Sequence, residues 1–204
     1  MVIKFFKHLH LVNKHRFYVC RNCFIAGQYK RGLLHDLSKY SPTEFFESVK
    51  YYQGDRSPID ACKEINGWSK AWMHHKGRNR HHWEYWIDNI NNGYPEAILM
   101  PYEFAVEMLC DYIGAGQAYE KYWTPQSQYA WWQMKKTKVF MHPVIENFVD
   151  TILEEMAKND IWSQQERLQI PYKTYLAPKH LKYVYDLSCN KYSDLSNHYR
   201  KENF

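Results

Sequence analysis

Histidine and aspartate gather in two stretches of this sequence, and both residue types bind metal ions. The chain has 11 histidines. His35 is followed at once by Asp36, and four more histidines crowd one later stretch: His74, His75, His81 and His82. Metals of borderline softness accept imidazole and carboxylate ligands together. This composition indicates a divalent transition metal, Mn, Fe, Co, Ni or Zn, although an isolated His-Asp pair is more often simply solvated.

The order of these residues resembles that of the HD-domain superfamily of metal-dependent phosphohydrolases. His15, the pair His35-Asp36 in GLLHDLSK, and Asp111 in EMLCDYIGA follow one another as the His, His-Asp and Asp ligands of that superfamily do. The segments HRFYV and AWMHHKGRNRHHWEYW extend the likeness to a largely uncharacterised family of short bacterial and phage HD-like proteins. The resemblance covers roughly residues 12 to 155.

The resemblance implies a bundle of α-helices in which His15, His35, Asp36 and Asp111 converge on one ion. Where members of the superfamily bind two ions, the aspartate of the His-Asp pair bridges them, and two more histidines hold the second ion. Here those histidines would be His75 and His82, with His81 and His74 as alternatives. The interval from His15 to His35 is shorter than in many HD proteins, which leaves His8 and His10 open as the first ligand.

Three further residues are candidates for contact with a phosphate. Lys39 lies one helical turn after His35, where a cation can hold phosphate or simply favour a helix C-terminus. Arg78 and Asn79 belong to a glycine-containing loop that is either a substrate-binding loop or a solvated turn, and guanidinium groups match phosphate oxygens well. Glu107, one turn before Asp111, is either an outer partner that fixes a histidine tautomer or, as we favour, a surface charge.

The function that these expectations support is metal-dependent hydrolysis of a small phosphate ester, a nucleotide above all. An HD-type di-iron oxygenase is the alternative enzyme, and a non-catalytic metal-stabilised binding module is the third reading. The neighbouring aromatic residues fit a protein core better than a platform for a nucleobase: Trp68, Trp72, Trp83, Tyr85 and Trp86.

The length, apolar content and net charge of the chain indicate which class of protein it belongs to. The 204 residues, with 45% hydrophobic side chains, suffice for one packed domain. A net charge of +5, scattered along the chain, suits a small anionic substrate better than a nucleic-acid polymer. No apolar run approaches the ~20 residues of a membrane span, and the N-terminus lacks a secretory signal, so we expect a cytoplasmic protein without a membrane contact. A homo-oligomer is compatible with this composition.

The elements that must position these residues are helices. Helical periodicity and start signals predict segments that begin near the N-terminus and at residues 29, 42, 57, 101, 125 and 143. The segment 29–39 carries His35 and Asp36, and Ser41 to Glu44 reads as a capping box. A loop and short helix over 76–86, a turn at 91–95 and a capping box at 163–166 complete the pattern, without convincing strands. Cys20 and Cys23, in CxxC spacing, read as reduced packing residues rather than as a zinc site.

The fold prediction is therefore an all-α, HD-domain-like helical bundle. Its metal-binding domain spans residues 1–160. The extension 161–204 packs on the same domain, and the sequence does not assign its structure.

Overall fold

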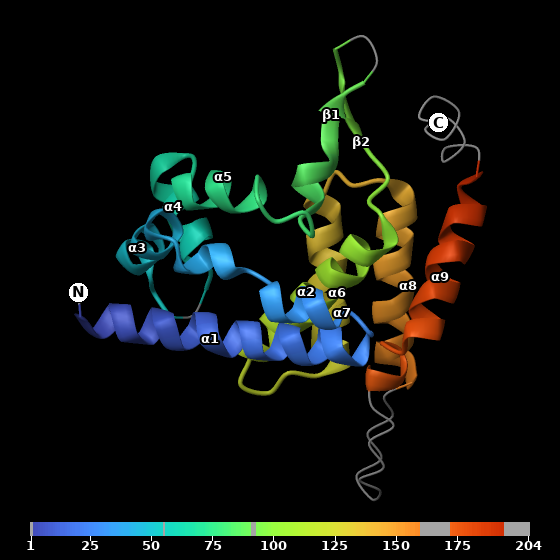
Figure 1. Ribbon diagram of the computed structural model, residues 1–204, viewed down its shortest axis with the longest axis horizontal. Helices are drawn as coiled ribbons and strands as arrows, with labels where there is room; N and C mark the ends of the chain where they lie inside the picture. The colour runs from blue at the N-terminus through green and yellow to red at the C-terminus, as the bar shows by residue number, and fades with distance from the viewer. Residues whose placement is uncertain (1, 55, 91–92, 160–171, 194–204) are drawn as a thin grey trace, which may run out of the picture.

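The computed structural model describes residues 2–54, 56–90, 93–159 and 172–193. Helices make up most of these residues, which confirms the all-α prediction (Figure 1). The α-helices are α1 (Val2–Ile25), α2 (Tyr29–Leu34), α3 (Pro42–Tyr51), α4 (Pro58–Asn66), α5 (Lys70–Lys76), α6 (Tyr102–Tyr119), α7 (Pro125–Lys135), α8 (Pro143–Asn159) and α9 (Pro178–Lys191). Short 3₁₀ turns lie at Leu37–Tyr40, Trp83–Trp86, Lys136–Lys138 and Tyr172–Thr174.

Helix α1 runs across the molecule and joins its two halves. Helices α3, α4 and α5 cover its N-terminal half, whereas α7, α8 and α9 stand at its far end (Figure 1). Helix α6 packs along α1, and α8 packs against α7 and α9. The core lies where these helices meet and includes Val19 of α1, Leu109 and Ile113 of α6, and Phe148 and Ile152 of α8.

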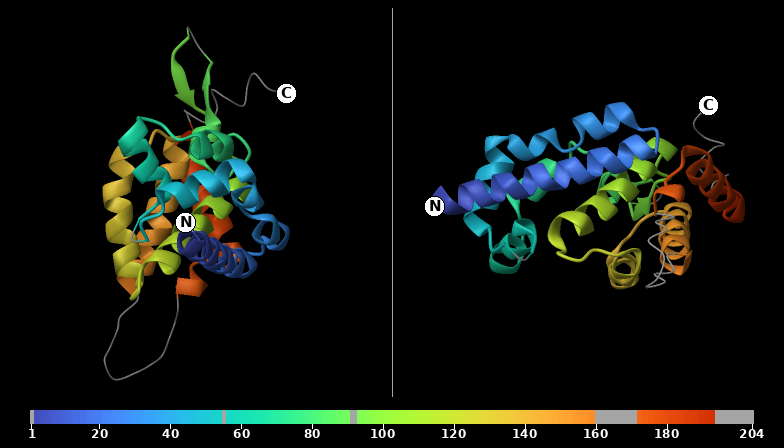
Figure 2. Two further views of the ribbon diagram at one scale, coloured as in Figure 1. Left: turned by 90° about the vertical axis from the view of Figure 1, so that its left-hand side faces the viewer. Right: turned by 90° about the horizontal axis from the view of Figure 1, so that it is seen from below.

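Several start signals in the sequence are confirmed. Helices α3, α4 and α7 begin at Pro42, Pro58 and Pro125, where a missing backbone N–H costs nothing. The helix predicted to begin at residue 57 ends at Gly67, whose φ of 78° terminates α4 before α5 begins. A short antiparallel hairpin of β1 (Ile87–Asn89) and β2 (Pro95–Ala97), which the sequence did not predict, stands out from the helices (Figure 2).

The expected helix over 29–39 is wrong in its second half, and this bears on the site. Helix α2 ends at Leu34, and His35 and Asp36 form a turn. Asp36 has a φ of 54°, in the left-handed region that Asp tolerates better than most residues. Arg16 of α1 donates from Nε to the His35 carbonyl at 2.8 Å, which ties this break to α1. His35 and Asp36 are therefore not helical neighbours, and both are buried.

The remaining predictions concern the cysteine pair of α1 and the C-terminal part of the chain. Cys20 and Cys23 are free thiols, with Cys23 buried and Cys20 half-buried. The capping box at 163–166 lies outside the described residues, and the domain boundary at 160 stays a prediction. Helix α9, which the sequence did not assign, packs on α8.

Helices α1 and α6 cross so closely that Gly114 cannot accept a side chain. A Cβ at Gly114 would lie 2.5 Å from Val19 Cγ2 and 2.9 Å from the Val19 backbone nitrogen. We expect Gly114→Ala to lower the free energy of unfolding by about 1–3 kcal/mol in chemical denaturation, because overpacking forces the two helices apart. The control is Gly67→Asn, at a left-handed position with open space around it, which should change the free energy of unfolding by less than ~1 kcal/mol. Equal effects of the two substitutions on this free energy would contradict the close crossing.

Candidate metal centre

Four side chains from three segments meet in a first ligand group beneath the break that follows α2. His15 comes from α1, His35 and Asp36 from the break, and Asp111 from α6; all four are buried. His15 Nε2 lies 3.3 Å from Asp36 Oδ2 and 3.1 Å from Asp111 Oδ1. His35 Nε2 lies 3.2 Å and 3.3 Å from the same two oxygens. The structure therefore brings together all four residues that the resemblance had matched.

A second ligand group shares Asp36 with the first. Its other members are His75 at the end of α5, and His81 and His82 just before the 3₁₀ turn Trp83–Trp86. His75 Nε2 and His81 Nε2 lie 3.3 Å and 3.4 Å from Asp36 Oδ1. Asp36 thus turns Oδ2 toward the first group and Oδ1 toward the second, as a carboxylate that bridges two ions would.

Unsatisfied polar atoms converge within these groups. Among the described residues, five buried atoms of the two groups have no hydrogen-bond partner: Nε2 of His35, His81 and His82, and Oδ1 of Asp36 and Asp111. Buried polar groups seldom stay unpaired, because each costs about 1–3 kcal/mol. Ligands bonded to a common ion at about 2.1 Å lie roughly 3.0–3.4 Å apart, which matches the contacts above. The two groups therefore fit divalent metal ions.

Two buried glutamates hold the outer nitrogens of the histidines. His35 Nδ1 donates to Glu107 Oε1 at 3.0 Å, and His75 Nδ1 donates to Glu44 Oε2 at 2.7 Å. Each contact fixes the tautomer that leaves Nε2 free for the centre. Our preference for Glu107 as a surface charge is therefore wrong. The capping-box reading of Glu44 is half wrong, since its N–H bonds Ser41 Oγ but its carboxylate faces His74 and His75.

The ionisation states of the carboxylates and of His82 suit metal binding. Burial would raise the pKa of Asp36, but the His35 ring and the Lys39 ammonium outweigh burial and hold that pKa well below its usual range. Burial, with help from the His81 and His75 rings, holds the pKa of His82 well below 6.5, so its imidazole is neutral. Burial opposes ionisation of Glu107, yet hydrogen bonds from His35 and His81 lower its pKa to about 2. Anionic carboxylates and neutral imidazole are the forms that ligate metals.

The alternative histidines fall into two sets. His81 belongs to the second ligand group beside the predicted His75 and His82. His74 lies outside both groups, with Nδ1 2.6 Å from Glu44 Oε1. His8 is buried but lies outside them, and His10 is exposed. The geometry therefore places His15, and neither His8 nor His10, beside the His-Asp pair.

Two cavities with different lining residues reach the centre. The larger, the arginine cavity, has a volume of about 610 Å³, and the four basic residues in its lining are Lys30, Arg31, Arg78 and Arg80. It reaches Asp36, His81 and Glu107. The smaller, the lysine cavity, has a volume of about 260 Å³ and reaches both groups; its lining includes Lys39, Lys135, Trp72 and Tyr119. The candidate phosphate-binding residues are thus divided, with Lys39 in one cavity and Arg78 and Asn79 in the other.

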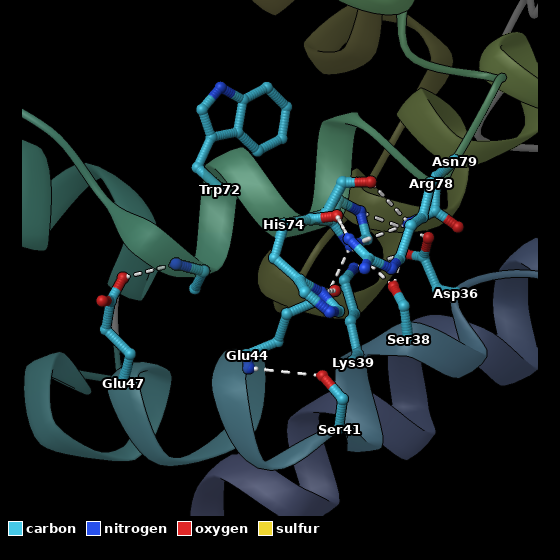
Figure 3. Close-up of polar contacts among 12 residues, drawn as sticks. Asp36, Ser38, Lys39, Ser41, Glu44, Glu47, Trp72, His74, Arg78 and Asn79 are labelled. Carbon is cyan, nitrogen blue, oxygen red and sulfur yellow. Dashed lines mark hydrogen bonds and ion pairs between the residues drawn. The ribbon is translucent and has the colours of Figure 1, made fainter.

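The close-up of this region shows how these candidates are held (Figure 3). Lys39 Nζ lies 2.6 Å from Asp36 Oδ2 across a 3₁₀ turn, so the predicted helical pairing with His35 is wrong. Asn79 donates from Nδ2 to Ser38 Oγ and to the His75 carbonyl, each at 2.9 Å, which fastens the loop beside a ligand. Arg78 is exposed and donates from Nη1 to the His74 carbonyl at 3.3 Å.

The aromatic residues do not share one role. Trp83 and Trp86 pack against the core, as predicted. Trp68 is 60% exposed and Tyr85 is 38% exposed, so the core prediction is wrong for these two. The Trp72 ring lines the lysine cavity and lies 5.0 Å, centroid to centroid, from the His82 ring.

We expect His8 to make the stability of the protein dependent on pH. It lies against the rings of Phe45 and Tyr52, and burial, together with the Lys39 charge, lowers its pKa from 6.5 to about 4. As the pH falls from 6.5 to 4, His8 becomes protonated in the unfolded chain but stays neutral in the folded protein. The free energy of unfolding therefore decreases. His8→Phe should remove up to about 3 kcal/mol of this loss. Urea unfolding at pH 7.5 and pH 5 measures this loss of unfolding free energy, and His10→Phe, at an exposed position, is the control. An equal pH dependence in wild type and His8→Phe would contradict the prediction.

The fold and the centre together define an all-α protein with two buried ligand groups that meet on one aspartate. The chain belongs to a family of unknown function, DUF5662, which it matches over residues 4–155. That match includes every residue of both ligand groups. No curated protein and no solved structure matches the chain. Among the described residues, no helix has both the length and the apolar character that crossing a bilayer requires.

Proposed function

We propose that this protein is a cytoplasmic phosphohydrolase that uses divalent transition-metal ions and acts on a small phosphate ester, a nucleotide above all. The observation that carries the proposal is the pair of ligand groups that meet on Asp36, together with two cavities that reach them and contain cationic side chains. The order of His15, His35-Asp36 and Asp111, which resembles the HD phosphohydrolases, supports the same activity. The assignment to that superfamily remains part of this proposal, as does any homo-oligomer.

The ligand groups define which residues would hold ions. His15, His35 and Asp111 would hold one ion, His75, His81 and His82 the other, and Asp36 would contribute one oxygen to each. Mn, Fe, Co, Ni and Zn all accept this mixture of imidazole and carboxylate. Such ions supply Lewis-acid polarisation of a phosphoryl oxygen and lower the pKa of water toward ~7.

The remaining side chains would bind and orient the substrate. Lys39, beside Asp36 in the lysine cavity, is placed to neutralise charge on a phosphate oxygen. Lys30, Arg78 and Arg80 give the arginine cavity a positive field that attracts anions. Trp72 lines the lysine cavity and would supply the aromatic contact that a nucleobase requires. Asn79 acts indirectly, since its amide holds the loop and the His75 carbonyl.

Phosphate release from purified protein tests this proposal. Untagged protein loaded with Mn²⁺, Fe²⁺, Co²⁺, Ni²⁺ or Zn²⁺ is incubated with nucleoside mono-, di- and triphosphates and with p-nitrophenyl phosphate, under argon and in air. Turnover that needs a metal and is equal under argon supports the hydrolase. Turnover only with iron and O₂ would replace it with the di-iron oxygenase, and none with any metal-loaded form would leave the metal-stabilised binding module.

A further inference from the structure

One carboxylate touches a histidine from each ligand group. Glu107 Oε1 lies 3.0 Å from His35 Nδ1 in the first group and 3.2 Å from His81 Nδ1 in the second. The three residues are buried, and the two rings lie 4.5 Å apart, centroid to centroid. We infer that Glu107 is a shared positioning residue that fixes one ligand of each group, so that both metal sites depend on a single glutamate.

The two contacts have the same consequence for each ring. A carboxylate only accepts hydrogen bonds, so both Nδ1 atoms must carry a proton. In the neutral form of the ring, which is the form that binds metals, each Nε2 then presents a lone pair. Those Nε2 atoms lie 3.2 Å from Asp36 Oδ2 for His35 and 3.4 Å from Asp36 Oδ1 for His81. Glu107 therefore aims one imidazole at each oxygen of the aspartate that the two groups share.

Arg31 fixes the orientation of this carboxylate. Its Nη1 donates to Glu107 Oε2 at 3.1 Å, and its guanidinium lies 3.9 Å from the centroid of the Phe104 ring. Oε2 is thus engaged by a donor while Oε1 serves the histidines. A glutamine cannot replace this arrangement. With its oxygen on Arg31, its NH₂ would face both Nδ1 atoms and drive their protons to Nε2; with the opposite orientation, its NH₂ would face the guanidinium.

Glu44 supplies a matched comparison, because it serves only one ligand group. Its Oε2 accepts from His75 Nδ1 at 2.7 Å, whereas its Oε1 contacts His74, which lies outside both groups. Glu44→Gln therefore makes the same chemical change beside the second group alone. The inference rests on the metal centre of the proposed function and is independent of phosphate hydrolysis.

Calorimetric titration of Co²⁺ into metal-stripped, untagged protein tests the inference. In Glu107→Gln we expect both binding steps to weaken by roughly 10–100-fold, the usual effect of losing an outer partner of a ligating histidine. In Glu44→Gln only one step should weaken. Nitrogen NMR supplies a readout that mere destabilisation would not move. With the glutamine oxygen on Arg31, His35 and His81 should both change from the Nδ1–H to the Nε2–H tautomer in Glu107→Gln.

Should Glu107→Gln fail to fold, Arg31→Met keeps the carboxylate but frees its orientation, and it should weaken both steps by a smaller factor. The inference is overturned if Glu107→Gln, or Arg31→Met in its place, weakens one step only or neither while the wild type binds ions in both steps. A wild type that binds no Co²⁺ would overturn the proposed centre and this inference with it.

Discussion

Replacing Asp36 with asparagine is expected to abolish both metal sites at once. Asp36 is the one residue common to the two groups described above, and each of its oxygens faces a different group. Asparagine keeps the shape of the side chain and tolerates the left-handed backbone at this position. It loses the charge and one of the two acceptor oxygens. Since the loss of an outer partner alone costs 10–100-fold in affinity, loss of this ligand should cost more than ~100-fold for each ion.

Elemental analysis of dialysed wild type and Asp36→Asn measures this effect directly. The control is Asp60→Asn, which removes a carboxylate from an exposed position on α4 and should leave the metal content unchanged. A variant that loses one ion and keeps the other would show that Asp36 belongs to a single site. Unchanged metal content would remove Asp36 from the centre altogether.

The second large effect is expected at Lys39. Its ammonium lies 2.6 Å from Asp36 Oδ2 and lines the lysine cavity. Burial would lower the pKa of Lys39, but the Asp36 and Asp111 carboxylates outweigh burial and raise it, so the cation is permanent near neutral pH. A cation at the end of a helical segment contributes only about 0.3–1 kcal/mol to stability. A preorganised cation that stabilises the negative charge developing in a transition state typically raises the rate by ~100-fold or more.

Lys39→Met keeps the apolar stem and removes the charge. We expect phosphate-ester turnover to fall by ~100-fold or more, while metal content is retained, because the lysine no longer competes for Asp36 Oδ2. Lys135→Met removes a second lysine from the lining of the same cavity and should change turnover far less. A Lys39→Met protein that melts several degrees lower yet hydrolyses normally would assign Lys39 to stability and remove the best cation from the proposed mechanism.

The sequence predicted those features that depend on local signals. Prolines at residues 42, 58 and 125 marked helix starts, and a continuous apolar pattern marked α6. The order of His15, His35-Asp36 and Asp111, read through a resemblance, named four side chains that the fold does bring together. These features were accessible because each depends on neighbours in the chain or on a recurrent order of ligands.

The features that were missed depend on contacts between distant segments. The break at His35-Asp36 requires Arg16 of α1 to bond the His35 carbonyl. Glu107 and Glu44 can be buried in their charged form because each accepts a hydrogen bond from a distant histidine. These histidines lie 72 and 31 positions away in the chain, respectively. That His81 joins the predicted His82 in the second group had no local basis, since adjacent residues in a loop give no indication of whether one ring or both turn inward. The position of Glu107 one helical turn before Asp111 was the signal in the sequence for an outer partner.

Both proposals require that this chain holds transition-metal ions at the two groups. The most direct test is inductively coupled plasma mass spectrometry of protein purified without a His-tag and dialysed against metal-free buffer, in parallel with His35→Ala. We expect stoichiometric Mn, Fe, Co, Ni or Zn in the wild type and a clear loss in the variant, with circular dichroism showing helical protein in both. A folded wild type without any of these metals, which also fails to take them up on addition, would contradict the account.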